Sequence, residues 1–358
     1  MTGRDFALAV VFGCLFLVAC NQQADLPTVL PEVVDRFEVG AGVYVRSLAV
    51  EAETNSLWVG SSVGVLQIDL QSHEMLHSFT RKDPLANEYI FAIGIDSAGY
   101  KWFGTNAGGV SRYRDGDWKV FFPMHGLADY WVYSFAEQSG GRFWIGTWAG
   151  ANLVDLDTMR FRTIKAELIN EWVYGIAVDS RDRVWFGTEG GVSMLDGENW
   201  SHWTHSDGIG VANENNLPIS QNTGLGTRTR HDLSVIVGGQ ESYNPSYVFS
   251  VLVDTNDVVW VGTWGGGISR YRNGAWQNYS MADGLAGDIV YSIAQGDDGV
   301  YWFGTNRGLS RFDGKQWKNY GVADGLPGEH VYAIAPSAND GIWVGTLNGV
   351  VRMATPQQ

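Results

Sequence analysis

Cysteine is nearly absent from the sequence, and both of its cysteines, Cys14 and Cys20, lie close to the N-terminus. The rest of the chain therefore cannot form an intrachain disulfide or a cysteine-based metal site. Basic residues are also scarce, because 24 Lys and Arg stand against 39 Asp and Glu and give a net charge of −15. This balance excludes nucleic acid and anionic lipid headgroups as expected partners, since both are bound by basic surfaces.

Long hydrophobic runs are lacking as well. The apolar run at residues 6–19 is shorter than the roughly 20 residues of a membrane-spanning helix and is typical of a signal-peptide core. It ends in Leu17-Val18-Ala19-Cys20, which resembles the lipobox of bacterial lipoproteins, whose cysteine is acylated. We therefore predict a signal peptide at 1–19, lipidation of Cys20 and a tether at 20–34, with the membrane reached only through the acyl chains.

This resemblance also implies a location. The expected place is the cell envelope outside the cytoplasm, and Asn21 after the cysteine favours the periplasmic side of the outer membrane in a Gram-negative cell. The alternative is an ordinary secretory signal in which Cys20 is incidental.

What the sequence has in abundance is a repeat. Its strongest element is Trp, a hydrophobic residue, Gly and Thr or Ser, and it begins at Trp58, Trp102, Trp144, Trp185, Trp260, Trp302 and Trp343. The spacings are 41–44 residues, with one of 75. A period near 42 is typical of four-stranded propeller blades. The sequence thus predicts an all-β protein, a seven-bladed β-propeller of antiparallel blades at 35–358 with one insertion at about 205–243.

The two ends of the chain complement each other. The last repeat contains three strands and lacks an outer one, whereas residues 35–39 precede the first inner strand and are free to supply it. We therefore predict that the N-terminal strand completes the last blade and closes the ring, which removes exposed sheet edges. An open β-solenoid is the alternative, and it requires no complementary ends.

The repeat units are similar to those of the two-component regulator propeller family. The similarity rests on Ala282-Asp283-Gly284-Leu285, on residues 302–309 (WFGTNRGL) and on Arg311-Phe312-Asp313. In this family such propellers are often the periplasmic sensor halves of hybrid histidine kinases, so the resemblance implies a sensor. No connector, membrane helix or kinase follows Met353, and a sensor of this kind would need a separate signalling protein.

A candidate binding site follows from propeller geometry. The loops between second and third strands and the connections between blades share one face, here named the loop face, and loops on a rigid scaffold usually carry function. Trp131 and Trp172 begin inner strands at the central mouth of this face, whereas Trp148 and Trp264 directly follow Gly-Thr pairs and are expected in loops that bury little area. The remaining candidates on this face are Glu171, Glu189, Asn306, Arg307 and His330.

The tryptophans have two interpretations. Flat aromatic faces beside carboxylates suit sugars, amines or aromatic ligands, but the same rings could simply pack one blade against the next. A column of small residues in the inner strands is explained by crowding around the axis, not as a set of nucleophiles: Ser47, Ala92, Ser134, Gly175, Ser250, Ser292 and Ala333. Asp-rich segments at 179–182 and 254–257 are typical of β-turns rather than calcium loops.

Three functions remain in competition. The first is a binding or sensor module for a small molecule or glycan, the second a scaffold that docks an envelope protein, and the third a propeller lyase or hydrolase. The third is disfavoured because His125, Glu189, Arg307 and His330 are scattered over different blades. We therefore expect no enzymatic activity and no cofactor. We also expect no metal site, because His202 and His205 lie near an outer strand, where two histidines are more often surface groups.

Overall fold

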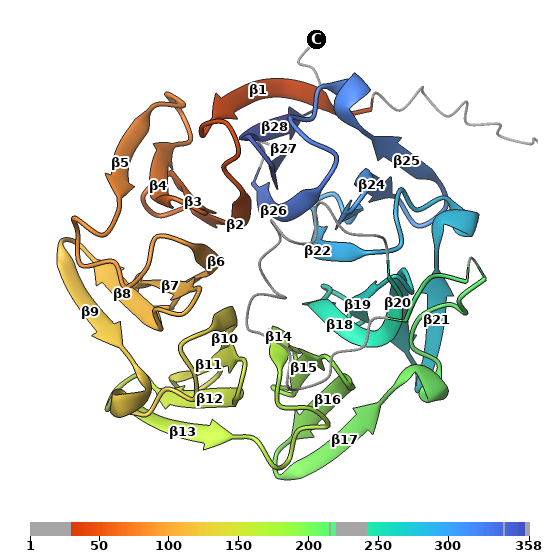
Figure 1. Cartoon of the computed structure of the whole chain (residues 1–358), viewed down its shortest axis with the longest axis horizontal. Helices are drawn as coiled ribbons and strands as arrows, with labels where there is room; N and C mark the ends of the chain where they lie inside the picture. The colour runs from red at the N-terminus through yellow and green to blue at the C-terminus, as the bar shows by residue number, and fades with distance from the viewer. Residues whose placement is uncertain (1–29, 215, 220–241, 339–340, 355–358) are drawn as a thin grey trace, which may run out of the picture. The chain divides into compact units, whose positions relative to one another are not determined.

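Seven four-stranded antiparallel sheets stand around a central axis and form the blades of a propeller (Figure 1). The structure, a computed structural model, describes residues 30–214, 216–219, 242–338 and 341–354. The predicted signal peptide, Cys20, residues 20–29 of the tether and residues 220–241 of the insertion lie outside the described residues. The seven-bladed fold predicted from the repeat is confirmed.

Each blade runs from the axis outward. The innermost strands are β2 (Val45–Glu51), β6 (Ile90–Ile95), β10 (Val132–Gln138), β14 (Val173–Val178), β18 (Asn244–Val253), β22 (Val290–Gln295) and β26 (Val331–Ser337). The second strands, which contain the repeat tryptophans, are β3 (Ser56–Ser61), β7 (Lys101–Thr105), β11 (Arg142–Thr147), β15 (Val184–Thr188), β19 (Val259–Trp264), β23 (Tyr301–Thr305) and β27 (Gly341–Thr346).

The third strands are β4 (Gly64–Asp69), β8 (Val110–Arg114), β12 (Gly150–Asp155), β16 (Gly191–Asp196), β20 (Ile268–Arg272), β24 (Gly308–Phe312) and β28 (Gly349–Ala354). The outer strands are β5 (Met75–Phe79), β9 (Asp117–Phe121), β13 (Arg160–Ile164), β17 (Asn199–Trp203), β21 (Ala275–Tyr279), β25 (Trp317–Tyr320) and β1 (Glu32–Glu38). We number the blades one to seven, from the blade that begins at β2 to the blade that begins at β26.

The N-terminal strand closes the ring, as predicted. β1 pairs antiparallel with β28 and is the fourth strand of the last sheet, whose order is β1-β28-β27-β26. The Phe37 ring lies 5.6 Å from that of Trp343, and Arg352 Nε donates to Asp35 Oδ2 at 2.6 Å. The strand begins at Glu32, three residues before the start expected from the sequence, because β28 extends to Ala354 and Glu32 pairs with that residue.

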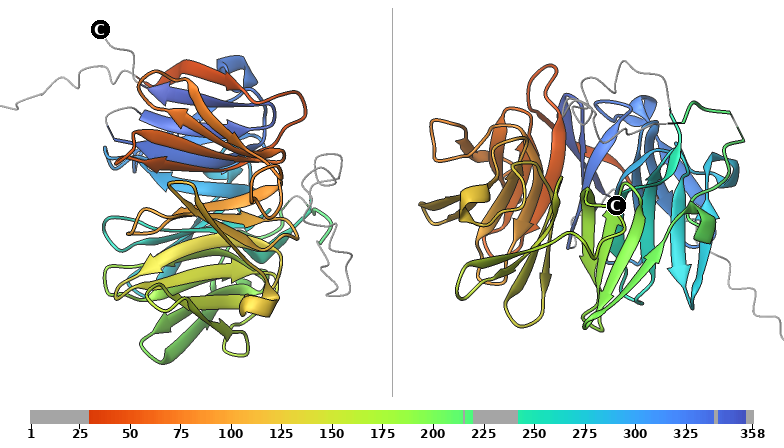
Figure 2. Two further views of the ribbon diagram at one scale, coloured as in Figure 1. Left: turned by 90° about the vertical axis from the view of Figure 1, so that its left-hand side faces the viewer. Right: turned by 60° about the horizontal axis from the view of Figure 1, so that its bottom comes forward.

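The repeat tryptophans form the core between blades. Trp302 of blade six packs against Val331 and Val344 of blade seven, and Trp343 of blade seven packs in the same way against blade one. Neighbouring sheets therefore lie face to face around the ring (Figure 2). In five blades the indole N–H also donates, at 2.8–3.0 Å, to an acidic or amide side chain at the end of the inner strand.

The residues after each tryptophan have equally specific roles. A Cβ added to Gly304 would lie 2.4 Å from Ser292 Oγ and 2.5 Å from the Val331 carbonyl oxygen, so only glycine fits there. The same holds where Gly60 lies beside Ser47, and the steric explanation of the small-residue column is confirmed. The Thr or Ser hydroxyl that follows donates to a carbonyl at the start of the third strand in every blade.

The connections between blades explain the Asp-Gly-Leu motif. A single turn of 3₁₀ helix begins four of them: η1 (Pro123–His125), η2 (His205–Asp207), η4 (Met281–Asp283) and η5 (Val322–Asp324). In η4, Asp283 Oδ2 accepts from the Ser280 N–H at 2.9 Å, and Gly284 follows with a φ of 116°, which favours glycine. Leu285 is then buried between blades five and six.

The described residues include no helix that is long and apolar enough to cross a membrane. The attachment predicted at Cys20 is independent of such a helix.

Removing β1 tests the closure. We expect a variant lacking residues 32–38 to melt about 5–10 °C lower and to self-associate, because it loses Phe37 packing, worth about 3–5 kcal/mol, and exposes β28 as an open edge. Differential scanning calorimetry and size-exclusion chromatography measure both effects. A matched variant lacking residues 22–28, which retains β1, serves as the control. A monomeric variant without β1 that melts with the wild type would contradict this account of closure.

Candidate functional site

The loop face brings together the segments that the sequence analysis assigned to it. In five blades a backbone hydrogen bond joins the loop after the second strand to the residue before the inner strand of the same blade, and in blades five and seven the loop bonds to the next blade. The Asn306 N–H donates to Ile289 O at 3.0 Å, and the Trp148 N–H donates to Trp131 O at 3.2 Å. The shared face is therefore fixed by main-chain contacts and does not depend on loop sequence.

Three of the four predicted tryptophans pack together on this face. The Trp148 ring lies between those of Trp131 and Trp172, with ring centroids 5.4 Å apart and edge-to-face geometry in both pairs. Trp131 and Trp172 are buried, whereas Trp148 is half-buried. Trp148 is therefore the member of this cluster that a ligand could reach.

Trp264 differs from the expectation of a loop residue that buries little area. It is the last residue of β19, is only 6% exposed and stacks on Tyr247 at 5.4 Å and 11°. The reason is the length of β18, whose first residue, Asn244, pairs with Trp264 and extends the sheet past the Gly-Thr pair. Trp264 therefore belongs to the same packed core as Trp131 and Trp172, where its ring stacks on Tyr247.

The polar candidates are distributed over several places. Glu171 forms an ion pair with Lys165, and the buried Glu189 accepts a hydrogen bond from the Tyr174 hydroxyl at 3.0 Å. His330 lies across the mouth, where its ring stacks on Tyr332 at 5.9 Å. Asn306 and the exposed Arg307 line a separate cavity of about 400 Å³, beside Asp288 and Leu217. The structure therefore does not gather the predicted residues into one slot.

The sequence analysis missed a layer of side chains inside the channel. Seven equivalent residues, here named the mouth residues, lie at or just before the starts of the inner strands: Tyr44, Tyr89, Trp131, Trp172, Tyr247, Ile289 and His330. Two residues further along the chain, six inner strands contribute an aromatic ring and the seventh contributes an arginine. We name this second set the aromatic layer; it consists of Arg46, Phe91, Tyr133, Tyr174, Phe249, Tyr291 and Tyr332. Consecutive rings from Phe91 to Tyr332 lie 4.9–6.0 Å apart. The Arg46 guanidinium closes the circle, 5.7 Å from the Tyr332 ring and 5.0 Å from the Phe91 ring. An alignment of the seven inner strands at this column would have revealed it.

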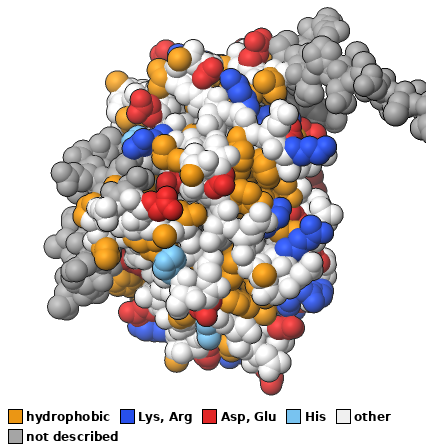
Figure 3. Space-filling model, turned by 90° about the vertical axis from the view of Figure 1, so that its right-hand side faces the viewer, with side chains coloured by type: hydrophobic (Ala, Val, Ile, Leu, Met, Phe, Trp, Pro, Cys, Tyr) orange, Lys and Arg blue, Asp and Glu red, His pale blue; other side chains and the backbone are white. Residues whose placement is uncertain are grey.

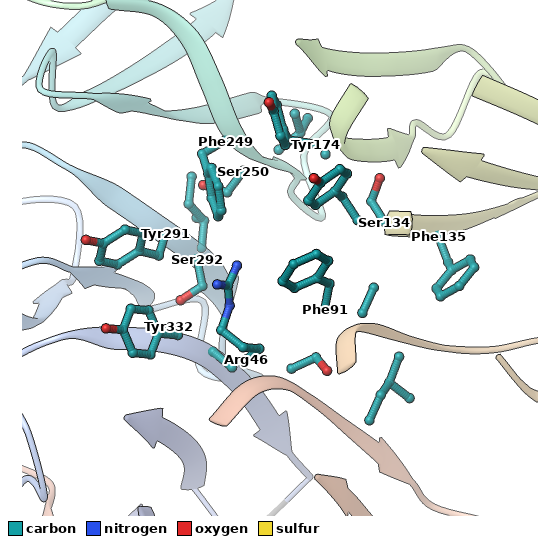
Figure 4. Close-up of a pocket in the computed structure, with 18 of the residues that line it drawn as sticks. Arg46, Phe91, Ser134, Phe135, Tyr174, Phe249, Ser250, Tyr291, Ser292 and Tyr332 are labelled. Carbon is teal, nitrogen blue, oxygen red and sulfur yellow. The ribbon is translucent and has the colours of Figure 1, made fainter. Parts of the chain in front are cut away.

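A cavity of about 290 Å³ begins at the aromatic layer (Figure 4). Three consecutive residues from each inner strand line it, for example Arg46-Ser47-Leu48 and Tyr332-Ala333-Ile334, and none of the mouth residues does. In β2 and β10 the first two residues are buried and the next four are half-buried. Packed aromatic side chains therefore close the channel toward the loop face, and the cavity lies on the side of the aromatic layer that faces the opposite face.

The electrostatics of the aromatic layer are set by burial. Desolvation raises the pKa of Tyr133 and Tyr174 well above the usual value, so both hydroxyls stay protonated at physiological pH. Arg46 is 8% exposed, forms no ion pair or hydrogen bond with the described residues, and leaves Nη1 without a partner. Tyr332 and Ser292 also line the cavity, and their buried hydroxyl oxygens have no hydrogen-bond partner either.

Metal ligation finds no support in the described part of the chain, where no three His, Cys, Asp or Glu side chains are grouped to hold an ion. His202 Nδ1 lies 3.0 Å from Ser193 Oγ, and His205 Nδ1 lies 2.6 Å from the Ile209 carbonyl oxygen. Asp179 and Asp254 accept hydrogen bonds from backbone N–H groups of their own turns and from a repeat tryptophan, which confirms that these segments are β-turns.

Comparison with solved structures shows the same fold elsewhere. An extracellular domain assigned to a hybrid two-component system of B. thetaiotaomicron superposes with a TM-score of 0.70 at 20% identity, over 89% of this chain and 40% of that one. The chain thus spans less than half the length of this neighbour. A streptogramin B lyase superposes with a TM-score of 0.65 at 13% identity, over 91% of this chain and 98% of that one. A virginiamycin B lyase from Staphylococcus aureus superposes with a TM-score of 0.65 at 13% identity, over 89% of this chain and 98% of that one.

At these identities the likeness shows the fold alone, and no curated protein matches the chain. The model of the two-component regulator propeller matches residues 167–190, 284–307 and 325–348. Each match begins in or near a connection between blades and ends in the loop after a second strand, so it covers the segments that build the loop face. The chain is therefore a seven-bladed propeller in which three segments match the two-component regulator propeller repeat.

Proposed function

We propose that the propeller is the binding module of a sensor system and that it receives a small molecule in its central channel. The observation that carries this proposal is the cavity of about 290 Å³ at the aromatic layer. Strands from seven separate blades line the cavity, so its walls are held by the whole ring. A concave space with aromatic walls and a few polar groups is typical of small-molecule sites.

The lining favours binding over catalysis. The side chains around this cavity, all of which belong to the described part of the chain, include no His, Asp, Glu, Lys or Cys. The only ionisable groups are one arginine and tyrosines, and burial raises the pKa of Tyr133, Tyr174 and Tyr332. Neither residue type is a general base near neutral pH in such surroundings. We therefore do not propose for this channel the activity of the lyases among the structural neighbours.

The loop face remains a second place where a ligand could bind. The half-buried Trp148, with Trp131 and Trp172 packed against it, suits a sugar ring stacked on its indole. This cluster offers one partly exposed ring rather than an enclosed space. The channel is the stronger candidate for that reason, and the two sites can be separated by experiment.

We further propose that the module works outside the cytoplasm, attached to a membrane through acyl chains on Cys20. The signal-peptide pattern and the lipobox sequence support this location. A signalling protein is the partner that we propose for such a sensor module, as the likeness of its repeats to the two-component regulator propeller implies.

A protein-docking scaffold is the competing proposal. On the side of the propeller drawn in Figure 3, hydrophobic side chains occur among acidic and basic ones. The exposed hydrophobic residues are spread over distant blades, as Met75, Met124 and Val322 illustrate. A docking face would require a larger contiguous patch, so the scaffold is less well supported than the channel.

The channel and the loop face can be distinguished with two variants. We screen glycans, amino acids and organic acids for ligands that raise the melting temperature of the wild type. Phe249→Ala, in the aromatic layer, is expected to weaken the affinity for such a ligand by about 1–3 kcal/mol, because a stacked ring is lost. The matched Trp148→Ala variant is expected to leave the affinity unchanged. Isothermal titration calorimetry gives both values, and the reverse pattern would move the site to the loop face.

Acylation is tested at Cys20. We expect Cys20→Ser to abolish incorporation of radiolabelled palmitate, since serine lacks the sulfur atom that forms the thioether to the lipid. The variant is also expected to leave the membrane fraction as an unprocessed or released protein. Metabolic labelling and fractionation of cells measure this. Cys14→Ser is the control and should behave as the wild type. Wild-type levels of palmitate label and of protein in the membrane fraction for Cys20→Ser would contradict the proposal that the protein is a lipoprotein.

A further inference from the structure

One member of the aromatic layer has an unusual chemistry. Six inner strands place a ring at this position, and β2 places the Arg46 guanidinium there instead. Figure 4 shows this side chain reaching into the channel between Phe91 and Tyr332. An aromatic residue at this position would complete the ring, so packing alone does not explain an arginine.

Arg46 also differs from the other buried cations. Among the described residues, three cationic side chains are buried: Arg46, Lys101 and Arg311. Lys101 Nζ lies 2.9 Å from Glu51 Oε1, and Arg311 Nη1 lies 3.7 Å from Asp313 Oδ2. Arg46 has the faces of two rings but no carboxylate within ion-pair distance in this part of the chain, and its Nη1 has no acceptor. A buried, unpaired charge is costly, and it is retained most readily where a partner of opposite charge arrives with a ligand.

The surroundings complement an anion with an apolar body. Ser292 lines the same cavity, and its hydroxyl lacks a hydrogen-bond partner and points toward Arg46 in Figure 4, so it can donate to an oxygen atom of a ligand held there. The rings of Phe91 and Phe249 provide flat apolar walls. The volume of about 290 Å³ is roughly twice the ~150 Å³ of an engineered cavity that takes up benzene. A single ring with a carboxylate therefore fits.

We propose that Arg46 is the anchor of an anion site in the channel, and that the ligand class is a small organic carboxylate. Its carboxylate pairs with the guanidinium, whose fork of N–H donors matches two carboxylate oxygens, and its body packs against the aromatic layer. The ligand enters from the face opposite the loop face, because the channel is closed on the other side. This inference rests on the proposed function, since it names the ligand class of the same cavity.

The test compares a charged and a neutral probe of the same shape. Benzoate and benzyl alcohol are titrated into the full-length wild type, Arg46→Met and the control Arg272→Met, whose arginine lies exposed on an outer hairpin. Benzoate is expected to raise the melting temperature of the wild type and of Arg272→Met, and to bind Arg46→Met at least tenfold more weakly in calorimetry. Benzyl alcohol is expected to bind all three proteins equally and more weakly. Inorganic phosphate is the third probe and is expected to have less effect than benzoate.

A second readout separates binding from a structural role. Without any probe, Arg46→Met is expected to melt at or above the wild-type temperature, because methionine removes the unpaired charge and keeps an unbranched side chain of similar length. A variant that melts well below the wild type, together with no effect of benzoate on the wild type, would assign Arg46 to folding and overturn the proposal.

The remaining outcomes are equally decisive. Equal binding of benzoate to the wild type and to Arg46→Met would overturn the anion site while leaving a small-molecule site in the channel, which keeps the two proposals distinguishable. A phosphate effect that equals or exceeds that of benzoate would overturn the organic part of the ligand class. No response of the wild type to any of the three probes would overturn the anion proposal as a whole.

Discussion

The crowding of seven inner strands around one axis is the constraint on which the rest of the structure depends. The second strand of each blade can approach its inner strand only because glycine lies opposite a small residue, as Gly304 lies opposite Ser292. This close approach brings the tryptophan before the glycine onto the next blade and sets the hydroxyl after it over the turn to the third strand. The repeat therefore encodes one local contact, and the ring follows from its repetition and from closure by β1.

The same crowding makes the channel asymmetric. Near the loop face the inner strands carry large rings that touch their neighbours around the axis, whereas toward the opposite face their residues are half-buried. A channel closed at one end and open at the other is a pocket. Because its walls come from all seven blades, a ligand held there contacts the whole ring at once and could stabilise the closed propeller as a unit.

The sequence was sufficient for the fold because the repeat is strict. The count of tryptophans predicted seven blades, and the missing outer strand of the last blade predicted closure by the N-terminal segment. Both are confirmed, with β1 beginning at Glu32 rather than at residue 35. The loop face could also be predicted, since it follows from blade topology alone.

The interior of the channel could not be predicted from the same pattern. Tyr291 was not among the predicted site residues, because a strand pattern does not say which side chains meet across the axis. Trp264 was expected in a loop, because pairing of the long β18 with β19 depends on tertiary context. Arg46 carried a signal, as a single cation in the column of rings that directly precedes the small residues, but the column alone does not show that these side chains meet inside the channel.

Anomalous diffraction from crystals soaked in bromide is the most direct test of the pocket. Bromide is an anion that can be located by its scattering without knowledge of the natural ligand. The account predicts a bromide peak inside the channel, within hydrogen-bond reach of the Arg46 guanidinium and on the side of the aromatic layer that faces away from the loop face. Bromide found only on the outer surface or at the loop face, with the channel free of it, would contradict the account.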